Sequence, residues 1–217
     1  RAIAPSASSG RTWLASSITS KSNSAAPGGR YCAIEMGLIS RTGLIAAPLW
    51  ASAKACSISV GTLYIYYKDK DDLIQKIGAI IALKFFTSTV KNFSPEMSFE
   101  EGLWKQWENR ANFTMKYPKE VAFFEIVKHS PHSEIILDSI QEFADFRRIM
   151  KTFIENGLRN NELIPMTFEA FWSVAYGPLY TLLNLHTEGK SMGGKPFTLT
   201  KEIMKEAFQA TVKGLKP

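Results

Sequence analysis

The sequence is poor in cysteine and in long apolar runs. It contains two cysteines, Cys32 and Cys56, whose spacing matches neither a zinc site nor a redox motif. This scarcity favours a reducing compartment, so we expect a cytoplasmic protein. The best apolar candidate for a membrane helix, residues 77–86, is interrupted by Lys84, whereas such a helix needs about 20 apolar residues. We therefore expect no membrane span.

Catalytic and metal-binding patterns are also lacking. His129 and His132 form an H-x-x-H pair, but Pro131 stands between them and no acidic or cysteine partner lies at metal-ligand spacing. No nucleophile–base pair and no carboxylate pair is legible in the sequence. We therefore expect no metal, no cofactor, no catalytic residue and no enzymatic activity.

Acidic residues are nearly absent from the first quarter of the chain. Residues 1–56 hold six Lys or Arg and one acid, Glu35, so they carry +5 of the net charge of +6. They are rich in Ala, Ser, Gly and Pro and show no sustained apolar period. Three interpretations remain open: a disordered basic arm, an organellar transit peptide, and an out-of-frame segment that is not the natural sequence.

From Asp69 onward the sequence has apolar residues at helical spacing. Leu73 and Ile77 begin the pattern, and Ser98 with Glu101 has the order of a capping box. No segment alternates as a strand would. The expected fold class is all-α, with helices at about 69–91, 98–117, 118–127, 132–160, 168–187 and 200–212, and with a kink or break at Gly177-Pro178.

The stretch Ser57–Leu73, called the recognition motif below, combines tyrosines, lysines and a glycine in a way that suits a DNA groove. Ser59 is a good N-cap for a short helix that ends before Lys68. A helix entering the major groove presents its first residues to base edges, and the small Gly61 permits close approach. Hydroxyls and amines can bind phosphate oxygens. The alternative is that the tyrosines pack on neighbouring helices.

This motif resembles the recognition helix and following turn of the TetR family of bacterial transcriptional regulators. The resemblance implies a helix-turn-helix head, here residues 48–70, and a helical ligand-binding and dimerisation domain, here 71–217, after an atypical segment 1–47. The matching positions are Ile58, Ser59, Gly61, Leu63, Tyr64, Tyr66, Tyr67, Lys70, Asp71 and Leu73. The implied DNA contacts are Ser59, Val60, Gly61 and Thr62 in the groove, and Tyr64, Tyr66 and Lys70 on phosphate.

Upstream of the motif, the first two helices of that family are not legible. Residues 49–56 match the second of them well only at Ala53, and Ser52 stands where a buried isoleucine belongs. A recognition helix this short is marginal alone and needs those helices as a platform. An alternative function is therefore a helical ligand-binding dimer that has lost DNA binding.

The predicted function is a ligand-responsive transcriptional regulator that acts as a repressor. Its partners are operator DNA, a small-molecule effector and a second copy of the chain, bound through the helices at about 168–187 and 200–213. An effector pocket in such a bundle is apolar with few polar groups, so composition does not separate pocket from core. The candidate pocket residues are Trp104, Trp107, Arg110, Phe124, Trp172, Tyr176 and Tyr180.

Overall fold

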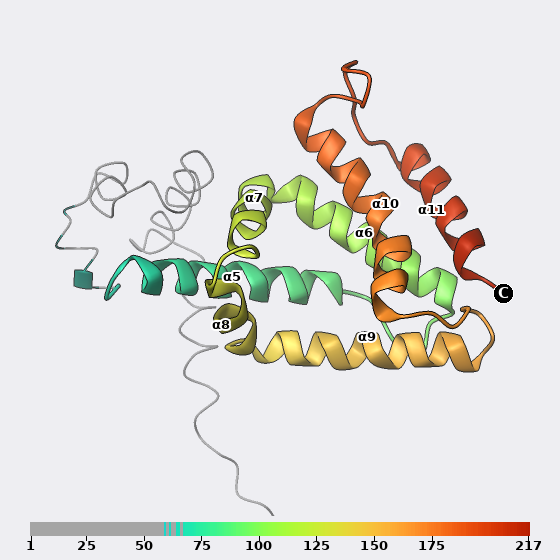
Figure 1. Cartoon of the computed structure of the whole chain (residues 1–217), viewed down its shortest axis with the longest axis horizontal. Helices are drawn as coiled ribbons and strands as arrows, with labels where there is room; N and C mark the ends of the chain where they lie inside the picture. Colours follow the sequence, from blue (N-terminus) through green and yellow to red (C-terminus); the bar gives the residue numbers. More distant parts are fainter. Residues whose placement is uncertain (1–58, 60, 62–63, 66) are drawn as a thin grey trace, which may run out of the picture. The chain divides into compact units, whose positions relative to one another are not determined.

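A computed structural model describes residues 59, 61, 64, 65 and 67–217, and these are helical with connecting loops (Figure 1). The described part holds no strand, only one isolated bridge between Lys190 and Pro196. The all-α prediction is confirmed. The named helices are α5 Lys70–Thr89, α6 Phe99–Lys116, α7 Pro118–Val127, α8 His132–Asp138, α9 Gln141–Arg159, α10 Phe168–Glu188 and α11 Lys201–Leu215.

The chain divides into two compact units, residues 1–73 and residues 74–217. The second unit is called the body below. The predictions for segment 1–47, and those for the head up to residue 58, lie outside the described residues.

Hydroxyl side chains cap the N-termini of three helices of the body. Ser98 Oγ accepts from the Glu101 amide and donates to the Glu101 carboxylate at 2.7 Å, so the predicted N-cap at Ser98 is confirmed, with the Glu101 carboxylate bound to the hydroxyl of Ser98. Thr167 caps α10 and Thr200 caps α11 by accepting from the amides three residues ahead. Each hydroxyl thereby satisfies a backbone donor that the first helical turn leaves free.

The single helix expected over residues 132–160 is wrong, because the structure has two helices there, α8 and α9. Ile140 between them has an extended backbone (φ −114, ψ 112) and a buried side chain. The Ser139 hydroxyl donates to the Ile136 carbonyl at 2.7 Å and so competes with continuation of the helix. Burial of Ile140 and this local bond outweigh the helical period that runs through both segments.

Of the kink or break expected at Gly177-Pro178, the break is wrong, since α10 runs without interruption from Phe168 to Glu188, and the kink stays a prediction. Proline lacks the N–H that an interior helical position normally donates. Two adjoining contacts support the helix there: Ala175 and Leu179 are fully buried, and the Trp107 indole donates to the Ala175 carbonyl at 2.7 Å. Tertiary packing therefore stabilises the helix where the proline lacks a backbone N–H donor.

Aromatic rings join the helices of the body into one core. Phe86 of α5 lies 5.0 Å from Phe143 and 5.1 Å from Phe146 of α9, measured between ring centroids. Phe99 of α6 stacks on Phe153 of α9 at 5.6 Å. Helices α6 and α9 approach so closely at Gly102 that an added Cβ would lie 2.7 Å from Cζ of Phe153. This position therefore accepts no side chain unless the ring moves.

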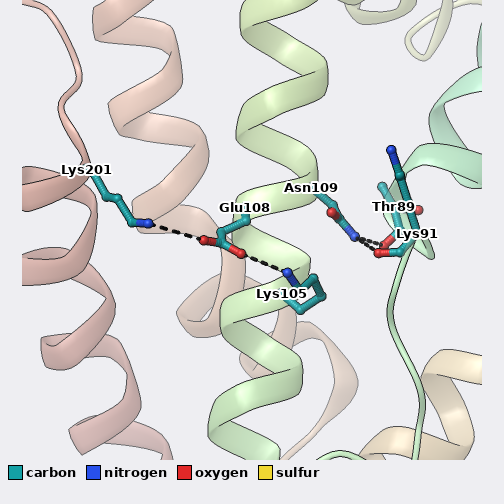
Figure 2. A network of polar contacts seen from close by, with 6 residues as sticks. All are labelled: Thr89, Lys91, Lys105, Glu108, Asn109 and Lys201. Carbon is teal, nitrogen blue, oxygen red and sulfur yellow. Dashed lines mark hydrogen bonds and ion pairs between the residues drawn. The ribbon is translucent and has the colours of Figure 1, made fainter.

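Helices α10 and α11 lie side by side at one end of the body (Figure 1, orange and red). Phe208 of α11 meets Trp107 of α6 at a centroid distance of 5.3 Å. Two partly exposed ion pairs add to this contact: Glu108 of α6 binds Lys105 at 3.0 Å and Lys201 of α11 at 3.8 Å (Figure 2). Of the helices in the described part, none has the length and apolar character needed to cross a membrane.

Candidate functional site

Several described residues of the recognition motif present side chains to solvent, whereas Leu73 at its end is buried. Gly61, Tyr64 and Ile65 are helical, and Tyr64 is 57% exposed and Ile65 77% exposed. Ser59 is exposed as well, and Lys70 is half-buried at the first position of α5. The other three predicted DNA contacts, Val60, Thr62 and Tyr66, lie outside the described residues.

Two aspartates close the turn that leads into α5. Asp69 Oδ1 accepts from the Asp72 amide at 2.8 Å, and Asp72 Oδ2 accepts from the Lys68 amide at 2.9 Å. With Asp71, Asp72 also places negative charge in the first turn of α5, where the helix dipole favours it. These bonds satisfy free amides and define where α5 begins, as the acidic start predicts.

Arg110 of α6 is the charged residue that the body buries most completely, at 1% exposure. Its Nη1 donates to Oε1 of Gln106, one helical turn earlier, while Nε and Nη2 have no hydrogen-bond partner among the described residues. Four aromatic rings from α5, α9 and α10 surround the guanidinium. Measured from Cζ to the ring centroids, the distances are 4.4 Å to Tyr176, 5.7 Å to Phe146, 5.7 Å to Trp172 and 5.9 Å to Phe85.

Tyr176 of α10 is the second unsatisfied group beside Arg110. Its ring is fully buried and its hydroxyl has no hydrogen-bond partner in the part of the chain that the structure describes. Burial raises the pKa of Tyr176 to about 12, although the positive charge of Arg110 acts in the opposite direction. The phenol is therefore neutral near pH 7 and retains a proton to donate.

Gln106 connects Arg110 to the C-terminal end of α5. Its Nε2 donates to the carbonyl of Thr89, the last residue of α5, at 2.9 Å. Asn109 donates to the same carbonyl at 2.9 Å and to that of Lys91 at 2.8 Å (Figure 2). The last carbonyls of a helix lack intrahelical donors, so these amides cap α5 from α6.

The predicted pocket residues separate into a group around Arg110 and residues placed elsewhere. Trp172 lies 4.6 Å from Tyr176 between ring centroids, and Tyr180 is half-buried and close enough to Tyr176 to raise its pKa. Phe124 joins this group indirectly, because it stacks on Phe85 at 6.2 Å. These residues and Arg110 gather side chains from α5, α6, α7 and α10.

Trp104 and Trp107 have different surroundings. Trp107 is fully buried and its only polar atom donates to the Ala175 carbonyl, so it is part of the core. Trp104 lies 4.9 Å from Phe208 and lines an open surface hollow of about 510 Å³. The other lining residues of this hollow are Ser98, Glu100, Glu101, Lys205, Phe208 and Gln209, so it does not include Arg110.

Sequence reasoning missed three members of the Arg110 group: Gln106, Phe85 and Phe146. A signal for Gln106 is present, since residues four apart on a helix share a face and Gln106 precedes Arg110 by four. The two phenylalanines carry no such signal, because they come from helices whose packing partners the sequence does not specify. Within the described part of the chain, no group of three or more His, Cys, Asp or Glu side chains could hold a metal ion.

Comparison with solved structures identifies the fold. The chain superposes on a TetR family transcription regulator from Marinobacter aquaeolei VT8 with a TM-score of 0.71, over 86% of this chain and 94% of that one, at 22% sequence identity. The fold is TetR-like. A TetR-family transcriptional regulator from Haemophilus influenzae Rd gives a TM-score of 0.68 over 88% of this chain and 97% of that one, at 19% identity.

Sequence comparison gives a shorter match to this TetR-like chain. A protein of Haemophilus influenzae described as an uncharacterized HTH-type transcriptional regulator is 25% identical over 104 residues, which is 48% of this chain and 56% of the relative. The match thus spans little more than half of that relative's length. No protein-family model matches the chain.

Proposed function

We propose that this chain is a ligand-responsive transcriptional repressor that binds operator DNA as a homodimer. The observation that carries the proposal is the TetR-like fold combined with a recognition motif in which Ser59 and Tyr64 are exposed to solvent. Both solved structures named above are described as TetR-family transcription regulators.

Binding to DNA is assigned to the recognition motif. Ser59, Val60, Gly61 and Thr62 approach base edges, and the remaining three assigned side chains, Tyr64, Tyr66 and Lys70, bind phosphate. Gly61 supports this assignment because, among the described residues, a Cβ at this position would meet only Ser59 Oγ, at 3.7 Å, which is ordinary contact. Packing against the described residues therefore leaves room at this position, as a close approach to base edges requires.

A gel shift with the DNA upstream of the chain's own gene tests this function. We expect binding that weakens steeply with salt, and a loss of about tenfold or more in specific affinity for Gly61→Ala, since a clash at the base edges costs about 1–3 kcal/mol. Lys70→Ala should weaken binding to all sequences and flatten the salt dependence. Lys91→Ala, at an exposed lysine after α5, is the matched control and should bind normally. Absence of any shift at low salt contradicts DNA binding.

The homodimer is assigned to α10 and α11. Support comes from the exposed apolar side chains of α10, Phe168 and Val174, and from Gly177 and Gly214, where an added Cβ meets nothing within 4 Å. Light scattering at micromolar concentration should give the mass of two chains, and Val174→Glu should reduce it to one. Ile135→Glu, at an exposed isoleucine of α8, is the control and should stay dimeric. A monomer mass for the unaltered chain contradicts this assignment.

Response to an effector is assigned to the body. The supporting observation is the Arg110 group, where a buried cation and a buried phenol lack partners beside the amide that caps α5. Helix α5 begins at Lys70, within the recognition motif, and ends at this cap. A ligand that alters the Arg110 group therefore acts on the helix that follows the DNA contacts in the chain.

A second candidate function is a ligand-binding dimer without DNA binding. The observation that favours it is the upstream sequence, where the helices expected to support the recognition helix are not legible. Amide hydrogen exchange separates the two candidates. Rapid exchange across residues 1–67 with protection after residue 72 supports the second candidate, whereas protection on both sides supports the regulator.

A further inference from the structure

We propose that the body binds an apolar or aromatic molecule through one carboxylate group, which accepts hydrogen bonds from Nε and Nη2 of Arg110 and from the hydroxyl of Tyr176. The inference rests on the proposed ligand response and names the chemical class of the effector. The four rings around Arg110 contact the apolar part of the molecule.

The first argument is that buried donors of Arg110 and Tyr176 lack a hydrogen-bond acceptor. Burying a positive charge is costly unless an anion and further hydrogen bonds compensate it. The described ion pairs of the body join other residues, and the only hydrogen bond of the Arg110 guanidinium goes to the neutral amide of Gln106. Two guanidinium nitrogens and the Tyr176 hydroxyl remain without acceptors at nearly complete burial. A bound anion supplies what these three donors lack.

The second argument is the geometry of the unused donors. Gln106 occupies Nη1, which leaves Nε and Nη2. Those two atoms form one edge of the guanidinium and direct two parallel N–H groups to the same side, an arrangement that matches the two oxygens of a carboxylate. The neutral phenol of Tyr176, with its ring 4.4 Å from Arg110 Cζ, offers a third donor.

The third argument is charge. No second cation of the described chain lies over the four rings that surround Arg110. One carboxylate neutralises one guanidinium. A phosphate monoester carries about −1.5 to −2 at pH 7 and would leave negative charge uncompensated among aromatic rings. The site therefore favours a carboxylic acid.

The fourth argument concerns the rest of the ligand and its entry. Phe146 and Tyr176 are buried, but Trp172 and Phe85 are half-buried, so these two rings separate Arg110 from solvent. Their side chains can rotate outward without breaking a backbone hydrogen bond, and rotamer changes of this kind commonly accompany binding. The molecule enters past Trp172, with its carboxylate toward Arg110 and its apolar part between the rings.

Calorimetry on the full-length chain tests the proposal with benzoate and octanoate as probes. Benzamide and octanamide are their neutral counterparts of nearly the same shape. We expect the two carboxylates to bind, to quench tryptophan fluorescence through Trp172, and to raise the thermal unfolding midpoint with increasing concentration. The amides should bind at least about tenfold more weakly, because a charge-assisted, bidentate contact is lost.

Three variants locate the binding site. Arg110→Met should lower carboxylate affinity about 100-fold or more, while raising the unfolding midpoint of the ligand-free protein because a buried unpaired charge is removed. Tyr176→Phe should lower affinity about 3- to 10-fold through the loss of one neutral donor. Arg148→Met, at an exposed arginine of α9, is the matched control and should leave both quantities unchanged.

The proposal is overturned if the amides bind as well as the carboxylates, or if neither carboxylate binds. It is equally overturned if Arg110→Met destabilises the ligand-free protein and leaves affinity unchanged, since water then satisfies the guanidinium. These readouts need no DNA. If the chain binds carboxylates normally but gives no gel shift, only the proposed DNA-binding function is contradicted. If it gives a gel shift but binds no carboxylate, only the inference about the ligand is contradicted.

Discussion

Two successive turns of α6 face α10 with opposite outcomes. Trp107 buries its ring and places its single N–H on the Ala175 carbonyl, so that every polar atom is paired. Arg110, three residues later, is buried as completely against the next residue of α10, Tyr176, but two of its nitrogens have no partner. The surroundings of both side chains are similarly apolar. What separates core from candidate site in this bundle is therefore whether buried polar atoms are satisfied.

The largest effect that we expect concerns Trp107, whose polar atom is paired, and it is a loss of unfolding free energy. Trp107→Ala removes a fully buried ring and leaves a cavity, so the free energy of unfolding should fall by about 3–5 kcal/mol. Urea unfolding followed by circular dichroism measures this loss. A loss below about 1 kcal/mol would mean that Trp107 is not core, and the distinction between the two turns would fail.

Gly102 tests packing on the α9 side of the same helix. Gly102→Ala should cost about 1–3 kcal/mol, because the new Cβ meets the Phe153 ring and Phe93 lies 3.2 Å away on its other side. Gly193→Ala is the control: nothing lies within 4 Å of a Cβ there. Its unfolding free energy should stay within about 0.5 kcal/mol of the unaltered chain. Equal costs for the two variants would contradict the close approach of α6 and α9.

Gln106 links the two turns and should show coupling. Gln106→Leu leaves Nη1 of Arg110 without its partner and leaves the Thr89 carbonyl with Asn109 as its side-chain donor, so we expect a loss of about 1–3 kcal/mol in unfolding free energy. In the Arg110→Met background the loss should be smaller, because one of the two partners is gone. Asn112→Leu, at an exposed position of α6, serves as the control. Strict additivity would show that Gln106 and Arg110 act independently.

The smallest effect is a pH dependence from Tyr176. Burial raises the pKa of Tyr176 from 10.0 to about 12, so its contribution to stability is complete below pH 10 and is lost as the pH rises from 10 to 12. Between about pH 9 and pH 11 the unaltered chain should lose about 1 kcal/mol more than Tyr176→Phe does. Urea midpoints at the two pH values measure the difference. An identical pH response in both proteins would place the phenol in water.

Local signals in the sequence are sufficient for most helix boundaries. Ser98, Thr167, Thr200 and Pro118 mark helix starts by side-chain chemistry that acts within a few residues, and the structure confirms these starts. The two errors are the continuous helix expected through Ile140 and the break expected at Pro178. Burial contributes at both positions, which a local pattern does not record, and at Ile140 the local bond from the Ser139 hydroxyl contributes as well.

The candidate site was predictable only in part. Arg110, Trp172 and Tyr176 could be named because an apolar effector pocket in a helical bundle is lined by large aromatic residues and a few polar groups. Their separation from Trp107 could not be foreseen, since all four residues have the same sequence environment and differ only in hydrogen bonding across helices. The DNA-contact assignments rest on the resemblance of the recognition motif and stay predictions.

The amide of Gln106 fixes the sign of the charge that the Arg110 group can accept. Its oxygen faces a guanidinium and its nitrogen faces the Thr89 carbonyl, so a flipped amide would set donor against donor and acceptor against acceptor. A glutamate at this position would neutralise Arg110 from within the chain, and the guanidinium would then need nothing from outside. With glutamine in that place, the charge of Arg110 has no counter-ion among the described residues, and the carboxylate proposed above would neutralise it.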